Sequence, residues 1–221
     1  MKDTPIFVVG PPRSGSSMVA AAIFLCGAWG RLHRDVRSSG FHLSVVDSCL
    51  LAPHIADSGY LLNLAGTMLP GVPCPKEGLE SPNFKGRFFG AVRTCGWQGG
   101  ALVVRSHLLL PFIPSIARDI PEARFVFTER DPLEIERSTK HTGGTPLRNL
   151  DGFWRTYASR YNAEMLRFAE ALGDRGCLYR PEAMARGNTI QIAEIATRLG
   201  LKWTAAAEAM VARISKPGRT V

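Results

Sequence analysis

The stretch that decides the fold lies near the N-terminus and reads Ile6-Phe7-Val8-Val9-Gly10-Pro11-Pro12-Arg13-Ser14-Gly15-Ser16-Ser17. Residues 6–9 are β-branched or aromatic and are followed by a Gly-Pro-Pro stop, which predicts a buried strand. A helix is predicted from Met18 to Cys26, where an apolar pattern follows the second glycine. A strand, a glycine-containing loop and a helix in this order open many nucleotide-binding α/β domains.

The loop at residues 10–17 has the spacing of the nucleotide P-loop, G-x-x-x-x-G-K-S/T, with Ser16 in the place of the lysine. The N-terminus of a helix offers unpaired amides and a positive dipole end, which favour a bound phosphate. The missing lysine is the one that reaches the β- and γ-phosphates, so the change disfavours a kinase and leaves Arg13 as the nearby cation. The alternative is an ordinary strand-to-helix turn with Ser16 as its N-cap.

Further elements alternate along the chain. Strands are predicted over residues 101–104, 124–128 and 177–179, and helices over residues 108–120, 131–141, 151–172, 189–199 and 204–214. This alternation predicts one α/β domain over residues 1–221, with a mostly parallel sheet flanked by helices and a P-loop-like topology. Ligands then bind at the carboxyl ends of the strands. Residues 37–100 are rich in glycine and proline, with one helix expected over residues 44–51, and we expect acceptor binding there.

A second polar cluster follows the predicted strand at residues 124–128. Arg130 stands at the strand end, and Ser138 follows eight residues later. A guanidinium makes bidentate contacts to phosphate, and the end of a strand is where ligands collect on such sheets. The alternative is that Arg130 pairs with Asp131 or Glu134 at a helix start and that Ser138 is a solvated helix residue.

Both clusters resemble elements of the sulfotransferases that use 3′-phosphoadenosine 5′-phosphosulfate (PAPS). The run Arg13-Ser14-Gly15-Ser16-Ser17 is similar to their 5′-phosphosulfate loop, in which Lys or Arg is followed by Ser-Gly-Thr/Ser-Thr/Ser. The resemblance implies that this run and Pro12 bind the 5′ side, with Arg13 at the bridging oxygen of the leaving phosphate. The spacing of Arg130 and Ser138 resembles the 3′-phosphate element, so both are expected to contact that phosphate.

A third stretch, Val103-Val104-Arg105-Ser106-His107-Leu108, resembles the Lys-Thr-His-Leu-Pro segment with the catalytic histidine of cytosolic sulfotransferases. The resemblance implies that His107 is the catalytic base, and its ordinary pKa near 6.5 would allow it to accept a hydroxyl proton. The alternative is a histidine that only hydrogen-bonds at a strand end. Many bacterial relatives use a carboxylate base from the variable middle, where Glu80 and Glu77 are the rivals. Tyr179, after Cys177-Leu178, resembles the family tyrosine that lies near the adenine.

Composition narrows the classes of partner. The net charge of +8 suits an anionic ligand, while dispersed basic residues without interleaved aromatics argue against nucleic acid. No apolar run reaches the ~18 residues of a membrane span, and the N-terminus has no secretory pattern, so we expect a cytoplasmic protein. Five scattered cysteines without a C-x-x-C pair indicate neither a zinc site nor a disulfide framework.

The expected function is therefore transfer of the sulfuryl group of PAPS to a hydroxyl or amine. The acceptor is a small molecule or glycan of unknown identity, and the positive charge is compatible with an anionic one. No metal is expected. Two alternatives remain open, namely a P-loop kinase of a nucleotide or small molecule, and a non-catalytic nucleotide-binding module of the same fold.

Overall fold

The computed structural model describes residues 3–30, 33–34, 41–42, 83–94, 96–141, 151–181 and 189–214. Four parallel strands form the central sheet in the spatial order β4-β1-β5-β6. Their bounds are Thr4–Val9 for β1, Ala101–Arg105 for β4, Arg124–Thr128 for β5 and Gly176–Tyr179 for β6. The short strands β2 (His33–Arg34) and β3 (Phe41–His42) pair separately and antiparallel. This arrangement confirms the α/β class and the mostly parallel sheet.

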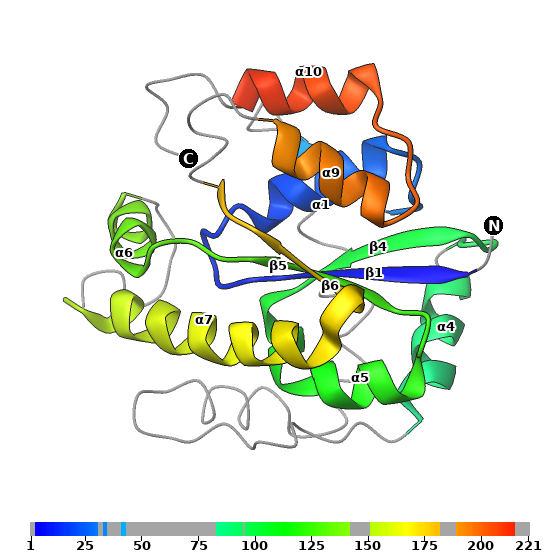
Figure 1. Ribbon diagram of the computed structural model, residues 1–221, viewed down its shortest axis with the longest axis horizontal. Coiled ribbons are helices and arrows are strands. Elements are labelled where there is room, and N and C mark those ends of the chain that lie inside the picture. Colours follow the sequence, from blue (N-terminus) through cyan, green and yellow to red (C-terminus); the bar gives the residue numbers. More distant parts are fainter. Residues whose placement is uncertain are drawn as a thin grey trace.

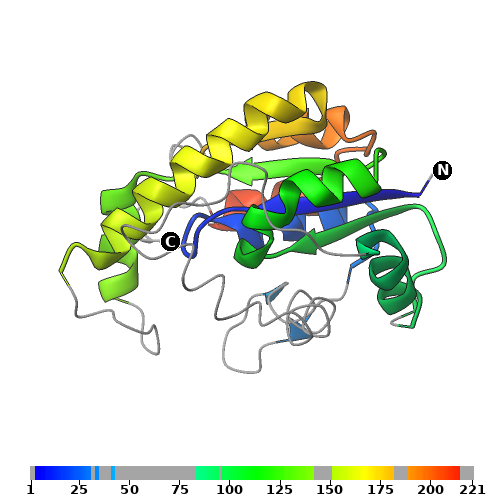
Figure 2. The ribbon, with the colours of Figure 1, turned by 90° about the horizontal axis from the view of Figure 1, so that it is seen from below.

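Helices cover both faces of the sheet (Figure 1). The upper face in that view carries α1 (Ser16–Leu25), α9 (Ile190–Arg198) and α10 (Ala205–Ile214). The lower face carries α4 (Phe84–Thr94), α5 (Ile113–Asp119) and α7 (Phe153–Leu172). The view from below in Figure 2 shows α7 running along the sheet, with α6 (Pro132–Lys140) near the end of α7 that begins it.

The strands are apolar on both sides because each face packs against helices. In β1, Phe7 and Val9 belong to the core between the sheet and helices α5 and α7. Ile6 and Val8 belong to the core between the sheet and helices α1 and α9. Such continuous apolar runs are typical of buried parallel strands. The ring of Phe7 lies 5.3 Å from Phe88 of α4 and 5.5 Å from Phe125 of β5, so aromatic packing joins three elements.

The order of the strands reverses at β1. The chain leaves β1 to form β4 on one side, and it later crosses to form β5 on the other. In open parallel sheets, ligands bind outside the carboxyl ends of the strands at such a reversal. The segments that follow β1, β4 and β5 contain the three polar clusters of the sequence, so the topology brings them to one edge.

Most predicted elements are confirmed within a few residues, and two differences have local causes. The helix expected over residues 108–120 divides into a 3-10 segment, η1 (His107–Phe112), and α5, because Pro111 lies inside the segment and has no N–H to donate. Helix α4 was not predicted, because glycines at positions 86 and 90 lower its helix propensity. The helix expected over residues 44–51 lies outside the described residues.

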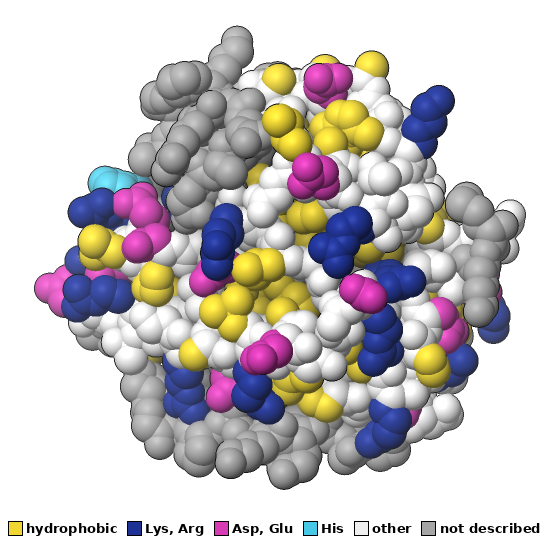
Figure 3. Space-filling view, viewed as in Figure 1, with side chains coloured by type: hydrophobic (Ala, Val, Ile, Leu, Met, Phe, Trp, Pro, Cys, Tyr) yellow, Lys and Arg dark blue, Asp and Glu magenta, His cyan; other side chains and the backbone are white. Residues whose placement is uncertain are grey.

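The outer surface carries charges of both signs. On the face in Figure 3, Lys and Arg side chains are interspersed with Asp and Glu, and small hydrophobic patches lie between them. Among the helices that the structure describes, none has both the length and the apolar character that crossing a bilayer requires.

Candidate active site

The loop after β1 is fixed against the end of β5. A Cβ atom added to Gly10 would overlap the Thr128 side chain and lie 2.6 Å from Ser14 Oγ, so only glycine fits this approach. The hydroxyls of Ser14 and Thr128 lie 2.7 Å apart, and both side chains are fully buried. This buried hydrogen bond joins the loop after β1 to the end of β5 and determines where the loop turns.

The loop then leaves helix amides exposed to a ligand. Gly15 is the N-cap of α1, its φ is +83°, and no side chain caps the helix. The amides of Met18 and Val19 donate to Gly15 O, as expected for a first turn. Within the described ranges, the amides of residues 15–17 have no acceptor, and an anion can satisfy them. The alternative with Ser16 as N-cap is therefore wrong.

Ser16 instead contacts an arginine from the next strand. Arg105 Nη1 donates to Ser16 Oγ over 3.3 Å, and Arg105 is half-buried at the end of β4. The resemblance places Arg105 where the cytosolic sulfotransferases have the Lys of their Lys-Thr-His segment, but no role was predicted for it. The signal that could have revealed it is a cation at the carboxyl end of a buried strand, where ligands collect.

The structure brings the first two clusters together although 125 residues separate Arg13 from Ser138. Arg13 Nε donates to Ser138 Oγ over 3.1 Å, and Arg130 Nη1 donates to the carbonyl oxygen of Arg13 over 2.8 Å. Partial burial and then the positive charge of Arg130 lower the pKa of Arg13. The two positive charges repel, so an anion bound beside them would stabilise both.

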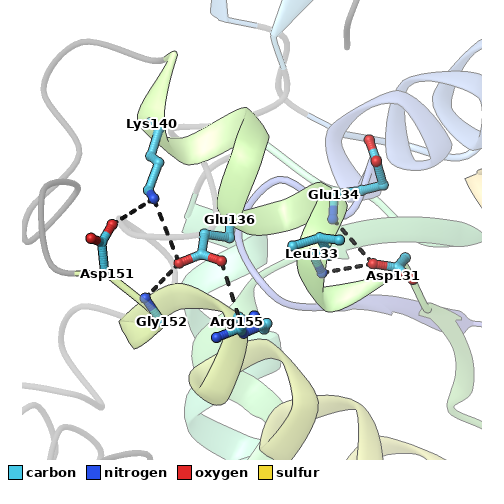
Figure 4. Close-up of polar contacts among 8 residues, drawn as sticks. All are labelled: Asp131, Leu133, Glu134, Glu136, Lys140, Asp151, Gly152 and Arg155. Carbon is cyan, nitrogen blue, oxygen red and sulfur yellow. Dashed lines mark hydrogen bonds and ion pairs between the residues drawn. The ribbon is translucent and has the colours of Figure 1, made fainter.

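The acidic residues of this cluster have partners within α6. Asp131 caps the helix by accepting from the amides of Leu133 at 2.6 Å and Glu134 at 3.1 Å (Figure 4). The Glu134 carboxylate pairs with Arg137 at 2.7 Å. Ser138 is not a solvated residue, because it is only 8% exposed.

His107 begins η1 directly beyond β4. The hydroxyl of Tyr161 in α7 donates to the carbonyl oxygen of His107 over 2.8 Å, which holds the main chain there. Burial and then the positive charge of Arg105 lower the pKa of His107 from 6.5 to about 4. The imidazole is therefore neutral at pH 7 and keeps a nitrogen lone pair with which it can accept a proton.

Of the remaining predicted residues, Tyr179 ends β6 at this same edge, opposite Thr128, and the two rival carboxylates are not described. The side chain of Tyr179 is 1% exposed and packs in the core with α1 and α9, and its expected place near the adenine stays a prediction. Glu77 and Glu80 lie outside the described residues. Among the residues that are described, no three His, Cys, Asp or Glu side chains form a group that could hold a metal ion.

Comparison with known proteins agrees with this geometry. The model of the "Sulfotransferase family" matches residues 5–205. Among curated proteins, no sequence matches the chain. Similar solved structures are 14–15% identical to the chain, and at this identity they show the fold alone.

One is the sulfotransferase domain of an olefin synthase from Synechococcus PCC 7002, with a TM-score of 0.53 and 14% identity over 93% of this chain and 76% of that one. Another is a sulfotransferase from Mycobacterium avium, with a TM-score of 0.53 and 14% identity over 97% and 68% of the two chains. A third is retinol dehydratase in complex with androsterone and inactive cofactor PAP, with a TM-score of 0.50 and 15% identity over 98% and 65%. Since the family model spans most of its length, the chain belongs to the sulfotransferase family.

Proposed function

We propose that this protein transfers the sulfuryl group of PAPS to a hydroxyl or amine of a small-molecule or glycan acceptor. The observation that carries the proposal is the contact between the two phosphate clusters, in which Arg130 donates to the main chain of Arg13 and Arg13 donates to Ser138. A nucleotide with phosphates on both its 3′ and 5′ positions needs two such anion sites side by side. A structural neighbour that was solved with PAP supports the same choice of nucleotide.

The 5′ site is expected to act by charge and position. The N-terminus of α1 offers the three amides of residues 15–17, and the cations near it are Arg13 of the loop and Arg105, which donates to Ser16. The same turn contains Pro12, Ser14, Ser16 and Ser17. Breaking the bond between the sulfuryl group and the 5′-phosphate leaves negative charge on the bridging oxygen. Fixed cations and amides that face this oxygen lower the barrier, since they need no reorganisation when the charge develops.

We assign to His107 the role of the base that takes the proton from the acceptor's hydroxyl or amine. Its imidazole is neutral at pH 7, and it follows the same strand that carries Arg105. With a pKa of about 4 it is a modest base, so its contribution comes from position as much as from basicity. Glu80 remains the rival base.

Two features bear on the alternatives. The loop has no lysine at position 16, and Glu129 at the end of β5 pairs with Arg180 at 2.6 Å. The missing lysine disfavours a kinase, and so does the engagement of Glu129, the carboxylate directly after β5, by Arg180. A binding module without turnover would share the nucleotide site, so turnover alone separates it from an enzyme.

The acceptor can be sought directly. Androsterone in the retinol dehydratase complex supports a small molecule, and the net charge of +8 supports an anionic one. Cell extract incubated with the protein and isotopically labelled PAPS should yield products that carry the labelled SO₃ group in a mass spectrometer. No labelled product from any extract would favour the binding module.

The test of the proposal is selectivity for a 3′-phosphate. Calorimetry should find that 3′-phosphoadenosine 5′-phosphate (PAP) binds on the order of 10²-fold more tightly than 5′-AMP, because Arg130 and Ser138 add charge-assisted contacts. Arg130→Ala should erase most of this difference, with a smaller loss of affinity for 5′-AMP because Arg130 also holds the loop at Arg13 O. Equal affinity of the wild type for the two nucleotides would contradict the proposed donor.

A further inference from the structure

Helix α7 carries two adjacent polar side chains that point toward the edge of the sheet where the strands end. The Tyr161 hydroxyl donates to the carbonyl of His107, and Asn162 Nδ2 donates to the carbonyl of Arg130, each over 2.8 Å. These carbonyls belong to the residues that follow β4 and β5, on either side of β1. One helix therefore holds the main chain at two points of the candidate site.

The burial of Asn162 costs free energy of folding. Its side chain is 7% exposed, and its Oδ1 atom has no hydrogen-bond partner in the part of the chain that the structure describes. A carbonyl acceptor requires a donor, so the bond to Arg130 fixes which end of the amide faces it. A buried, unsatisfied amide oxygen opposes folding by more than one neutral hydrogen bond returns. The hydrogen bond to Arg130 therefore gives this side chain little net stabilising effect.

We propose that Asn162 is a positioning residue for Arg130 and thereby a determinant of selectivity for the 3′-phosphate. The inference rests on the proposed function, because it assigns Arg130 to that phosphate. Asn162 fixes the peptide unit from which the guanidinium extends, and the guanidinium in turn donates to Arg13 O. A small shift of this peptide moves the end of a long side chain, so directional contacts to a phosphate suffer first.

The experiment measures the ratio of the affinities for PAP and 5′-AMP in the full-length protein by calorimetry. Asn162→Leu should lower this ratio between about threefold and tenfold, the range of one neutral hydrogen bond. The midpoint of thermal unfolding should change little, because the loss of the unsatisfied Oδ1 offsets the loss of the donor to the Arg130 carbonyl. A bond with a merely structural role would lower the midpoint and leave the ratio unchanged. Asn162→Ala is the second variant if Asn162→Leu does not fold.

Two controls make the result specific. Tyr161→Phe removes an equivalent bond from the neighbouring residue of the same helix and should keep the wild-type ratio. On the Arg130→Ala background, Asn162→Leu should change the ratio no further, because its effect passes through the missing guanidinium. If the wild type discriminates between the nucleotides and Asn162→Leu does so equally well, the positioning role is wrong and the proposed function stands. If the wild type itself does not discriminate, the proposed function fails first.

Discussion

At the scale of single residues, the site depends on small contacts that fix where cations stand. Arg13 itself has a φ of +67°, in the left-handed region that side chains rarely adopt. Such strain persists only where surrounding contacts compensate for it. Here the contacts are the donations from Arg13 to Ser138 and from Arg130 to Arg13 O. The loop thus holds its arginine in place before any ligand binds.

Replacing Arg13 should affect chemistry more than binding of the product nucleotide. Arg13→Ala should lower turnover by roughly 10²-fold or more, the usual effect of removing one group that stabilises transition-state charge. Arg13→Lys, which keeps the charge and loses the fork of donors, should retain more turnover than alanine. Rates are measured with the acceptor found in the extract screen, with and without EDTA. Activity that disappears in EDTA and returns with magnesium would favour the kinase alternative.

Two glycines allow a matched test of the loop. Gly10→Ala should destabilise the protein by about 1–3 kcal/mol, because the new methyl group overlaps Thr128 at a place where the backbone cannot move freely. Gly90→Ala lies within α4, with no atom within 4 Å of the added carbon, and should stabilise by about 0.5–1 kcal/mol. Denaturant unfolding of both variants gives the comparison. Equal effects of the same sign would mean that the loop is not fixed against β5.

At the scale of elements, α6 and α7 are joined by one buried carboxylate (Figure 4). Gly152 is the N-cap of α7 and has no side chain to cap the helix, so Glu136 of α6 accepts from its amide over 2.6 Å. Lys140 and Arg155 lie 3.9 Å from the same carboxylate. A negative group at a helix N-terminus is favourable, and here it also fixes the helix that carries Ser138.

The contribution of this contact can be compared with that of its exposed neighbour. Glu136→Ala should cost about 1–3 kcal/mol of unfolding free energy, because the Gly152 amide loses a charged, buried partner. Asp151→Ala removes an ion pair with Lys140 at 2.7 Å but should cost little, since Asp151 is 91% exposed and water screens the pair. Chemical denaturation at low and high salt measures both. If the two variants lose equal stability, the junction is not organised around Glu136.

The same junction shows why some element boundaries could be predicted and others could not. The start of α6 was predicted, because Asp131 and Pro132 carry a complete local signal and the structure has Asp131 as the cap. The predicted helix at residue 151 begins two residues later in the structure, since its cap contact comes from Glu136 on another helix. Helix α4 likewise gains its stability from rings such as Phe88 that pack against β1, which the local sequence does not reveal.

At the scale of the whole molecule, sequence patterns indicated the candidate site residues but not the α7 side chains that hold the main chain beside them. Motif spacing indicated Arg13, Arg130, Ser138 and His107, and the parallel sheet brings their segments to one edge. The contacts from α7 were not predicted, because Tyr161 and Asn162 match no motif and their partners are main-chain carbonyls far along the chain. The burial of Tyr179 was also missed, since a resemblance in sequence does not state which face of a strand a ring occupies.

Burial of His107 makes the stability of the whole fold depend on pH. The folded protein holds this imidazole neutral with a pKa of about 4, whereas in the unfolded chain it takes up a proton near 6.5. Between these values the unfolded state binds more protons, so the free energy of unfolding falls as the pH falls from about 6.5 to about 4. Above 6.5 the contribution is fully present. The loss amounts to at most about 3 kcal/mol, because the imidazole is partly exposed.

A variant that cannot titrate isolates this contribution. His107→Gln keeps a neutral polar side chain, so its unfolding free energy should decline less steeply than that of the wild type as the pH falls through this window. Carboxylates titrate in both proteins, and the difference between the two curves removes their common part. Unfolding in urea at several pH values from 7 to 4 provides the curves. Parallel curves would mean that His107 keeps an ordinary pKa, and the neutral, partly buried imidazole assigned to the site would then be wrong.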